Sequence, residues 1–426
     1  MNTKNTVSFL SQGCRLNHSE TAGLINEFKA KGFADVGLDD DPNIVVINTC
    51  TVTENGDKDT RRLVRKINEQ CSSPRIALIG CQAQIKKNHL MDLKNVEWVI
   101  GNETKDQTAR IILENNTGVH APKFEQKSFF QDYSSFDPKH TRVNLKIQDG
   151  CDFYCSFCII PFARGPARSR DFNNIIDDAK GLINLGVKEL VLTGINLGTY
   201  QFGAFNFYDL LESLLQLNPG TRIRISSIEP TTIDNRLIQL WQKYSNFCRY
   251  LHLPIQSATD EVLKLMRRKY SLNEYLDYIN DVRQTLPDMC IGTDVIVGFP
   301  GETAALFKST KATLSRAPID YFHVFSYSER SMAHSRKFEN QNPPAEIKAR
   351  SLALRGLHKI KWADFMRSKI GDVHHVLFEQ IKQDQWVGTT EHFIKVFVKS
   401  DDNLKNKSLR VKLNAMTERG IEGELV

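Results

Sequence analysis

Three cysteines stand close together in the stretch GCDFYCSFCIIPFARG, residues 150–165. They are Cys151, Cys155 and Cys158, with three and then two residues between them. A zinc ribbon uses closely spaced cysteine pairs that contribute four ligands, and no histidine lies near these three to complete a tetrahedron. Three thiolates are the protein ligands of a four-iron, four-sulfur cluster in which one iron stays open for another ligand. The spacing therefore favours an iron–sulfur site.

A second set of three cysteines lies upstream, where Cys14, Cys50 and Cys81 each follow an apolar run. The runs VSFLSQG, NIVVINT, RIALIG and VEWVIG alternate with helical patterns, which predicts an α/β domain with a parallel, doubly wound sheet. Because the carboxyl ends of neighbouring strands form the ligand crevice of such a sheet, we expect the three thiols to converge there. Any one of them alone would be a buried core thiol.

A second alternation of apolar runs and helical stretches begins at Val143. Six units predict a full or partial α/β barrel of the TIM-like kind, whose working residues lie where strands give way to loops. The runs are VNLKIQDGC, ELVLTGIN, RIRISSIEP, YLHLPIQS, DVIVGFPGE and YFHVFSYSE. The corresponding positions carry Cys151, Thr193, Gly194, Glu229, His252, Gln256 and residues 298–302. A lone histidine or glutamine beside a strand is more often a satisfied structural polar group, and this alternative stays open for His252 and Gln256.

Length and composition describe a soluble globular protein of two or three domains, with 426 residues, 41% of them apolar and 25% charged. The stretch MNTKNTVSFLSQ has no signal-peptide apolar region, and no later run approaches the roughly 20 residues that span a bilayer. We therefore expect a cytoplasmic protein without membrane contact. Nine cysteines, an odd number, make a disulfide framework improbable and favour metal or redox chemistry.

The remaining segments have simpler patterns. Residues 105–140, which include APKFEQKSFFQDYSSFDPKH, lose periodicity and predict a linker. After Gly371, short runs with polar turns predict a small antiparallel β-barrel of a kind that often binds oligonucleotides, although its net charge is −1. Residues 330–369 hold ten lysines or arginines against three acidic residues. This stretch favours either a polyanion contact or a solvated amphipathic helix between two domains.

The loop at residues 150–165 resembles that of the radical S-adenosylmethionine (SAM) enzymes, Cys-x-x-x-Cys-x-aromatic-Cys, with Phe157 in the aromatic place. The resemblance implies that the open iron chelates SAM and that an electron from the cluster cleaves it to a 5′-deoxyadenosyl radical. The protein then shields and aims the radical. We expect SAM to contact the following residues: Phe157, Thr193, Gly194, Asn196, Ser226, Glu229, His252, Gln256 and Val297.

Four further segments resemble the methylthiotransferase family over nearly the whole chain. They are GCRLNHSET at 13–21, INTCTVT at 47–53, LIGCQAQ at 78–84, and WVGTTEHFIKV, which is similar to a TRAM domain. The resemblance implies two [4Fe-4S] clusters: an auxiliary one on Cys14, Cys50 and Cys81, and the SAM cluster on Cys151, Cys155 and Cys158. It also implies three domains: an amino-terminal domain at 1–138, the radical SAM barrel with a basic linker helix at 139–370, and a TRAM-like substrate-binding domain at 371–426.

Three branches of this family differ in substrate, which is isopentenyladenosine in tRNA, an aspartate of a ribosomal protein, or threonylcarbamoyladenosine (t6A) at position 37 of tRNA. Arg15 and Leu16 after Cys14, and QDGC at 148–151, are closest to the t6A branch. The expected partners are a tRNA anticodon stem-loop, a reducing electron donor and a sulfur source. The alternatives are the other two substrates and, in another class, a non-catalytic iron–sulfur protein that binds nucleic acid.

Some residues are not assigned by the resemblance. Asp171 stands where the family often has proline, and Cys71, Cys248 and Cys290 have no role, although Cys71 lies near enough to Cys81 to compete as a ligand. Arg164, Arg168 and Arg170 are candidates for binding anticodon phosphates or the t6A carboxylate, because a guanidinium binds both in a bidentate way. Simple surface solvation is the alternative for each of these arginines.

Overall fold

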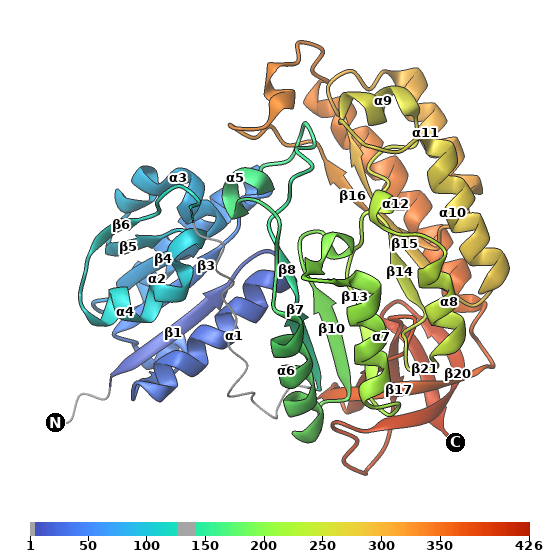
Figure 1. Cartoon of the computed structure of the whole chain (residues 1–426), viewed down its shortest axis with the longest axis horizontal. Helices are drawn as coiled ribbons and strands as arrows, with labels where there is room; N and C mark the ends of the chain where they lie inside the picture. Colours follow the sequence, from blue (N-terminus) through green and yellow to red (C-terminus); the bar gives the residue numbers. More distant parts are fainter. Residues whose placement is uncertain (1–4, 126–140) are drawn as a thin grey trace. The chain divides into compact units, whose positions relative to one another are not determined.

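The computed structural model describes residues 5–125 and 141–426, which divide into two compact units (Figure 1). The first unit contains the described residues up to 125 together with 148–170 and 328–336. The second contains 141–147, 171–327 and 337–426. The six cysteines of the two predicted sites, Cys14, Cys50, Cys81, Cys151, Cys155 and Cys158, all belong to the first unit. No helix among the described residues has the length and apolar character needed to cross a membrane.

The first unit is built on a parallel sheet of six strands in the order β2-β1-β3-β4-β5-β6. The strands are β1 (Thr6–Ser11), β2 (Ala34–Asp35), β3 (Ile44–Thr49), β4 (Arg75–Gly80), β5 (Val96–Ile100) and β6 (Gly118–His120). The helices are α1 (Arg15–Ala30), α2 (Glu54–Gln70), α3 (Cys81–Met91) and α4 (Thr108–Leu113). Because β1, β3 and β4 are neighbours, their carboxyl ends lie side by side.

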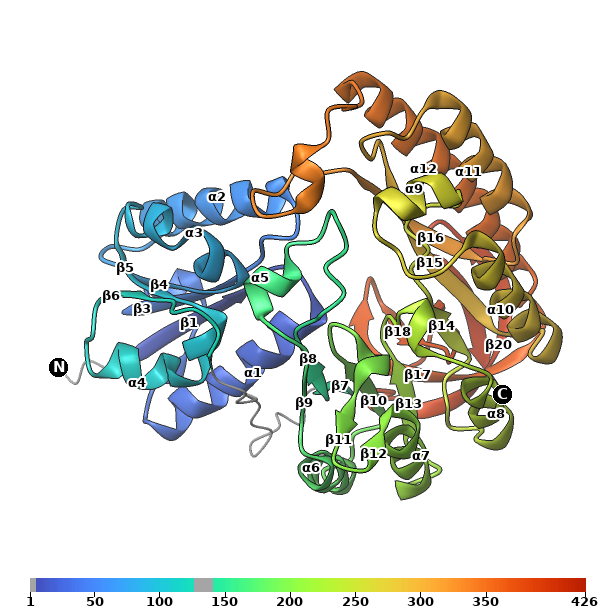
Figure 2. The ribbon, with the colours of Figure 1, turned by 45° about the horizontal axis from the view of Figure 1, so that its top comes forward.

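Helices cover both faces of this sheet (Figure 2), and each face has its own apolar core, as a doubly wound fold requires. Leu24 and Phe28 of α1 pack with Ile111 of α4 against one face. Val64 and Ile67 of α2 pack against the other. Since β3 and β4 bury residues on both faces, they are continuous apolar runs in the sequence, and the predicted doubly wound sheet is confirmed.

The second unit contains six parallel strands in two sheets, β13-β10-β7 and β14-β15-β16. Parallel bridges from Ile223 to Phe247 and from Ser227 to His252 connect the sheets, so the strands form a partial α/β barrel. The strands are β7 (Arg142–Lys146), β10 (Glu189–Thr193), β13 (Arg222–Ile225), β14 (Tyr250–His252), β15 (Cys290–Val297) and β16 (Tyr321–Ser326). The helices are α6 (Phe172–Asn184), α7 (Phe207–Leu217), α8 (Arg236–Lys243), α9 (Asp260–Leu265), α10 (Leu272–Thr285), α11 (Ala304–Arg316) and α12 (Pro344–Arg367).

The carboxy-terminal part of this unit is a closed β-barrel of strands in the order β17-β18-β19-β21-β20. The strands are β17 (Val373–Lys382), β18 (Gln385–Thr389), β19 (Lys395–Val398), β20 (Ser408–Thr417) and β21 (Gly420–Leu425). Val376, Phe378 and Val411 lie in its core, which includes Phe365 at the end of α12.

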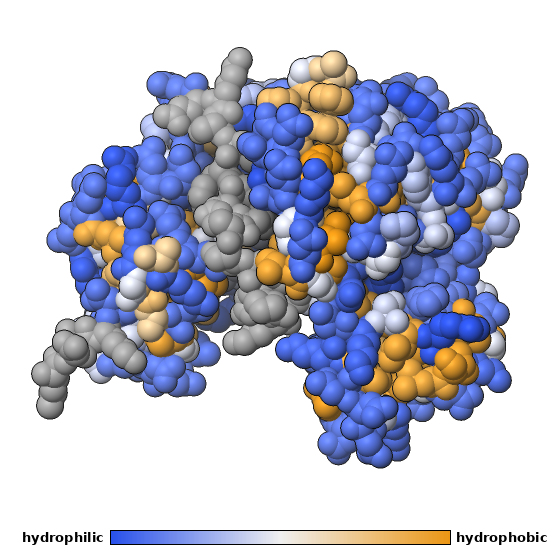
Figure 3. Space-filling view, turned by 60° about the horizontal axis from the view of Figure 1, so that its bottom comes forward, coloured by the Kyte–Doolittle hydropathy of each residue, from blue (hydrophilic) through white to orange (hydrophobic). Residues whose placement is uncertain are grey.

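On the face drawn in Figure 3 the surface is mainly hydrophilic, with hydrophobic side chains gathered in smaller patches.

The expected linker at 105–140 is only partly right. Its first residues form α4 and the edge strand β6, which pairs with β5, so they belong to the sheet. Residues 126–140 of the expected linker lie outside the described residues. Asp171, which replaces a frequent proline, begins α6: its carboxylate accepts a hydrogen bond from the backbone N–H of Asn174 at 2.9 Å and so caps the helix.

Candidate functional site

The carboxyl edge of the sheet in the first unit brings Cys14, Cys50 and Cys81 to one place. Cys14 is the cap before α1, Cys50 directly follows β3, and Cys81 is the first residue of α3. Gly13, with φ of +90°, lies so close to Cys50 that a Cβ on it would be 2.6 Å from the sulfur. A side chain at position 13 would clash with Cys50, so the close approach of these two cysteine segments requires glycine. The predicted convergence of these thiols is present in the structure.

A cluster at this edge requires negatively charged thiolates, which the protein alone does not favour. Burial, together with the neighbouring Cys81 and Cys14, raises the pKa of Cys50 to about 12. A cationic metal is what stabilises such a thiolate, because metal ligation deprotonates a thiol outright. Three thiols at one edge of the sheet, with no disulfide among the nine cysteines of the described residues, fit an iron–sulfur cluster.

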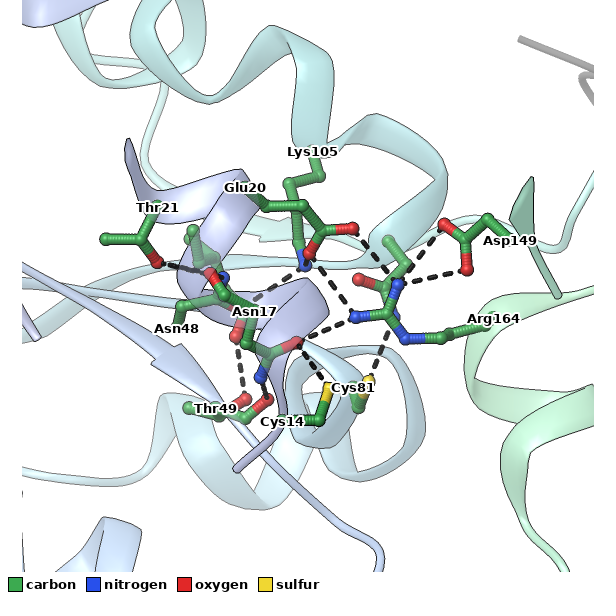
Figure 4. Close-up of polar contacts among 12 residues, drawn as sticks. Cys14, Asn17, Glu20, Thr21, Asn48, Thr49, Cys81, Lys105, Asp149 and Arg164 are labelled. Carbon is green, nitrogen blue, oxygen red and sulfur yellow. Dashed lines mark hydrogen bonds and ion pairs between the residues drawn. The ribbon is translucent and has the colours of Figure 1, made fainter. Parts of the chain in front are cut away.

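Beside the first set of thiols, the guanidinium of Arg164 is fully buried and contacts residues of α1 and Asp149 (Figure 4). Arg164 follows the loop of Cys151, Cys155 and Cys158, in the short helix α5 (Ile160–Arg164). Its Nη1 lies 3.0 Å from Glu20 Oε1 and 3.0 Å from Asp149 Oδ1, and its Nη2 donates to Asn17 Oδ1 at 2.7 Å. Lys105 Nζ contacts the other oxygen of Glu20 at 2.7 Å. Two buried cations thus offset two buried carboxylates.

Amide side chains connect this network to the sulfur atoms. Asn17, whose Oδ1 accepts from Arg164, lies 4.0 Å from Cys14 Sγ. Asn102 Nδ2 lies 3.4 Å from Cys81 Sγ and donates to the carbonyl oxygen of Ala163 at 2.6 Å. Amide donors to a cluster sulfur tune its reduction potential, and Asn102 is placed to do so.

The loop of Cys151, Cys155 and Cys158 is held by backbone contacts. The N–H of Cys151 donates to the carbonyl oxygen of Gly165 at 3.1 Å, and that of Cys158 donates to Cys155 at 3.0 Å. Gly150 has φ of +71°, and a Cβ there would be 1.9 Å from the carbonyl oxygen of Pro166. The strands β8 (Gln148–Asp149) and β9 (Arg168–Ser169) pair at the base of the loop. Half-buried thiols on a fixed loop again fit a cluster, and Phe157 lies between the last two.

A segment distant in sequence, residues 328–336, completes the first unit. Arg330 is buried and forms an ion pair with Asp57 of α2, whose carboxylate also lies 2.7 Å from Lys86 Nζ. The N–H of Ser335 donates to the carbonyl oxygen of Ser156 at 2.8 Å. The segment therefore contacts both the helix that follows Cys50 and the loop of the second cysteine set.

In the second unit, the expected SAM contacts lie where strands of the partial barrel end. Thr193 and Val297 are the buried last residues of β10 and β15, and Ser226 follows β13 with its N–H donating to Leu192 at 3.0 Å. Gly194 and Asn196 are in the turn after β10, where Asn196 is buried. The predicted placement at the barrel rim is present, whereas the binding of SAM by these residues stays a prediction.

Two carboxylates at this rim are paired with arginines. Glu229 lies 2.5 Å from Arg268 Nη2, and burial raises its pKa despite that arginine. Glu302 accepts from the N–H of Gly298 and from Arg350 of α12, both at 2.7 Å. Glu302 therefore fixes the turn after β15.

His252, the last residue of β14, belongs to a hydrogen-bonded group. Its Nε2 lies 3.1 Å from Asp294 Oδ1 and its Nδ1 lies 2.8 Å from the hydroxyl of Tyr321. Burial alone would raise the pKa of Asp294, but hydrogen bonds from His252 and His323 hold it well below its usual range. Gln256 has φ of +65° and its N–H donates to the carbonyl oxygen of Asp294 at 2.8 Å. The structural alternative for His252 therefore has direct support.

The hypothesis that Arg164 binds phosphate is wrong, because its side chain is 0% exposed and bound to two carboxylates. Arg168 donates to the carbonyl oxygen of Arg164 at 2.8 Å and pairs with Asp149, and Arg170 is buried. No local pattern in the sequence indicates this network, in which Asn17 and Glu20 of α1 take part. Their role depends on partners more than a hundred residues away.

The three unassigned cysteines are buried away from both sets. Burial raises the pKa of Cys71, Cys248 and Cys290. Cys71 packs in the apolar core between the sheet and α2, and its Sγ lies 3.7 Å from the carbonyl oxygen of Leu38. Cys248 and Cys290 are in the second unit. All three are ordinary core thiols.

Comparison with protein families identifies two matched regions. Residues 145–313 match the radical SAM superfamily, and residues 6–101 match the uncharacterized protein family UPF0004. The solved structure of the radical SAM methyltransferase TsrM from Kitasatospora setae, with cobalamin and a [4Fe-4S] cluster, superposes with a TM-score of 0.57 at 14% identity, covering 76% of this chain and 75% of that one. At this identity the likeness concerns the fold alone.

Curated relatives extend over nearly the whole chain. The threonylcarbamoyladenosine tRNA methylthiotransferase MtaB of Bacillus subtilis is 34% identical, covering 96% of this chain and 93% of its own length. The MtaB protein of Aquifex aeolicus is 35% identical over 86% of this chain and 90% of its own. A tRNA-2-methylthio-N(6)-dimethylallyladenosine synthase of Lawsonia intracellularis is 28% identical over 97% of each chain.

Proposed function

Because the chain belongs to the radical SAM methylthiotransferase family, we propose that its substrate is t6A at position 37 of tRNA and that it methylthiolates carbon 2 of the adenine. The enzyme class follows from the family, as does the use of SAM and [4Fe-4S] clusters. The single observation that carries the choice of substrate is full-length similarity at 34% identity to a protein named for t6A. The relative named for dimethylallyladenosine is less similar, at 28%.

Cys14, Cys50 and Cys81 would hold the auxiliary cluster, and Cys151, Cys155 and Cys158 the SAM cluster. When bound, these groups supply the electron that starts the radical chemistry and the sulfur that is inserted, with a reducing donor and a sulfur source as further partners. Arg164 positions the two cysteine regions, because it contacts Asn17 and Glu20 of α1 as well as Asp149 beside the loop. Asn102 donates toward Cys81 and would tune the cluster held there.

The SAM contacts at the rim of the partial barrel are part of this proposal. Thr193, Ser226 and Val297 present strand ends, and Glu229 presents a carboxylate whose geometry Arg268 fixes. A Ser226→Ala variant that binds SAM as tightly as wild type in equilibrium dialysis would remove that residue from the set.

We also propose three modules along the chain, at residues 1–138, 139–370 and 371–426, with a TRAM-like role in substrate binding for the last. The six-stranded sheet, the partial barrel with α12, and the closed five-stranded barrel support this division. Limited proteolysis should produce fragments that begin or end near residues 138 and 370. Fragments with other boundaries would contradict the three-module division.

The substrate is identified by mass spectrometry of tRNA nucleosides. Reconstituted protein, SAM, sulfide and a reductant are incubated anaerobically with t6A-containing tRNA, and a 2-methylthio form of t6A is the expected product. A parallel reaction with isopentenyladenosine tRNA and one with ribosomal protein test the other branches. Release of deoxyadenosine without methylthio-t6A, together with modification in one of those reactions, would overturn the proposed substrate.

Most cations of the basic stretch at residues 330–369 contact other groups of the protein, so fewer of them are available to bind tRNA phosphates. Lys361 Nζ donates to the carbonyl oxygens of Ser315 and Ala317, at 3.2 and 3.0 Å, whereas Lys359 is exposed on α12. Arg330 and Arg350 are buried in ion pairs. The polyanion contact therefore rests on exposed residues such as Lys359.

We expect a Lys359→Gln variant to bind tRNA more weakly and to reduce the slope of log affinity against log salt by about 1, because one phosphate contact is lost. Fluorescence anisotropy with labelled tRNA over a series of salt concentrations measures both. Lys361→Gln is the matched control on the same helix and should leave the salt slope unchanged. An unchanged slope for Lys359→Gln would leave α12 as a connecting helix without a role in binding tRNA.

A further inference from the structure

A second group of possible metal ligands lies in the carboxy-terminal part of the second unit, apart from the cysteines. His374 is in β17, and Glu391 and His392 are in the turn between β18 and β19. One ligand atom from each of these three residues lies within 4.8 Å of the other two. The turn is held in place by Arg224, which donates to the carbonyl oxygens of Glu391 and Thr390 at 2.9 and 3.1 Å.

The spacing within this group suits a small divalent metal. Glu391 Oε1 lies 2.9 Å from His374 Nδ1 and 3.7 Å from His392 Nδ1. Ligands at about 2.0 Å from a tetrahedral zinc ion are about 3.3 Å apart, which lies between these two distances. The rings of His374 and His392 are nearly perpendicular, at 88°, with centroids 5.1 Å apart. Small rotations of the side chains would bring all three atoms onto one ion.

Buried ring nitrogens without hydrogen bonds are the second observation. The side chain of His392 is 1% exposed, and neither of its ring nitrogens has a hydrogen-bond partner among the described residues. His374 Nε2 and Glu391 Oε2 are also buried and have no hydrogen-bond partner among the described residues. Since buried polar atoms in native proteins are nearly always satisfied, a group of four such atoms needs an explanation. A cation bound at Glu391 Oε1 would provide a partner for His392 Nδ1, which lies 3.7 Å from that oxygen.

The charges around the group are compatible with a cation. Asp288 Oδ2 lies 3.7 Å from His392 Nε2, the side of the ring that faces away from Glu391 Oε1. This distance is that of an ion pair and is longer than a hydrogen bond, but the carboxylate lies on the side where metal-binding histidines commonly donate their second N–H. The cations near this group are Lys369, whose Nζ is directed to the carbonyl oxygen of Asp288 at 3.3 Å, Arg249, and Arg224, which is paired with Glu189. Glu391 and Asp288 supply two negative charges at the group itself.

The other histidine group in this unit does not have these properties. Both ring nitrogens of His252 are hydrogen-bonded, one to Asp294 and one to Tyr321. His323 shares the same oxygen of Asp294 at 3.2 Å. Hydrogen bonds therefore account for the ring nitrogens of His252. In the group of His374, Glu391 and His392, buried ring nitrogens have no such partner in the part of the chain that the structure describes.

We propose that His374, Glu391 and His392 bind a divalent transition-metal ion of the zinc class, with Asp288 orienting His392. Imidazole and carboxylate ligands suit zinc, and the ion would connect β17 to the turn between β18 and β19 and, through Asp288, to the loop before β15. Its role is to fix the closed barrel on the rest of the second unit. The site is independent of the cluster cysteines and of the identity of the RNA substrate.

Zinc content of the full-length protein, with its clusters reconstituted, tests the proposal. After exposure to zinc sulfate and passage over a chelating resin, we expect one equivalent of zinc by inductively coupled plasma mass spectrometry. Zinc K-edge absorption should give only nitrogen and oxygen neighbours at about 2.0–2.1 Å, whereas zinc at vacant cysteines would give sulfur at about 2.3 Å. Absence of zinc, or a sulfur shell, in the wild-type protein overturns the site without any variant.

Variants then assign the ligands. His392→Asn and His374→Gln should lose the retained zinc, and Asp288→Asn should weaken zinc affinity by about 10- to 100-fold. His375→Gln is the matched control, because His375 is the exposed neighbour of His374 on the same strand. Retention of zinc by both His392→Asn and His374→Gln, or its equal loss in His375→Gln, would contradict the assignment.

Discussion

A Cys155→Ala variant is expected to lose all detectable SAM cleavage while keeping its auxiliary cluster. Cys155 is the middle ligand of the second set, and a four-iron cluster held by three thiolates does not tolerate the loss of one. The first set is built from the ends of β3 and β4 and from the cap of α1, so its geometry does not depend on this side chain. Anaerobic release of deoxyadenosine measures cleavage, and iron content with Mössbauer spectra measures the remaining cluster.

The Cys50→Ala variant provides the converse result. It should cleave SAM but form no methylthio product, because the auxiliary site loses a ligand while Cys151, Cys155 and Cys158 remain. Cys71→Ala is the matched control for a buried thiol of the same unit and should behave as wild type in both assays. Efficient sulfur insertion by Cys50→Ala would show that the first set of cysteines has been assigned wrongly.

Replacing Arg164 with methionine is expected to destabilise the first unit by about 3–5 kcal/mol, because removal of one member of a buried ion pair leaves the others uncompensated. Glu20 would keep Lys105, and Asp149 would keep the weaker contact with Arg168 at 3.3 Å. Urea unfolding of the apoprotein under reducing conditions measures the loss, followed by fluorescence in a background where Trp98 of β5 is the one tryptophan retained.

Arg62→Met is the control for this substitution. Arg62 lies in the same unit and pairs with Asp59, but its side chain is 79% exposed, so its loss should change stability by no more than about 0.5 kcal/mol. A similar small change for Arg164→Met would mean that the buried network contributes little and that the packing of α5 alone positions the cysteine loop.

Sequence patterns predicted the parts of this structure that are local or repeated. The positions of Cys14, Cys50 and Cys81 followed from the period of strands and helices, because each cysteine comes at the carboxyl end of a parallel strand. The edge strand β6 was missed because it has only three residues and starts at a glycine. In the closed barrel, β18 is so short that it carries little periodicity, although all five of its residues are buried.

The polar contacts of the site depend on pairings that no local pattern contains. Arg164 was a candidate for binding phosphate or the t6A carboxylate because a guanidinium binds both in a bidentate way, whereas its partner Glu20 is 144 residues away. The same applies to His252, whose partner Tyr321 is 69 residues away. A polar or charged side chain is recognised as buried from the partner that it binds, and this partner is known only once the fold is known.

The late arrival of residues 328–336 has a consequence for synthesis of the protein on the ribosome. Asp57 meets Arg330 only after a further 273 residues have been translated. At about 5–20 residues per second this takes roughly 14–55 s, during which the buried carboxylate has Lys86 as its cation but lacks its arginine. The first unit is therefore finished only after most of the second has emerged. Cofactor loading before that point would meet a first unit that still lacks residues 328–336.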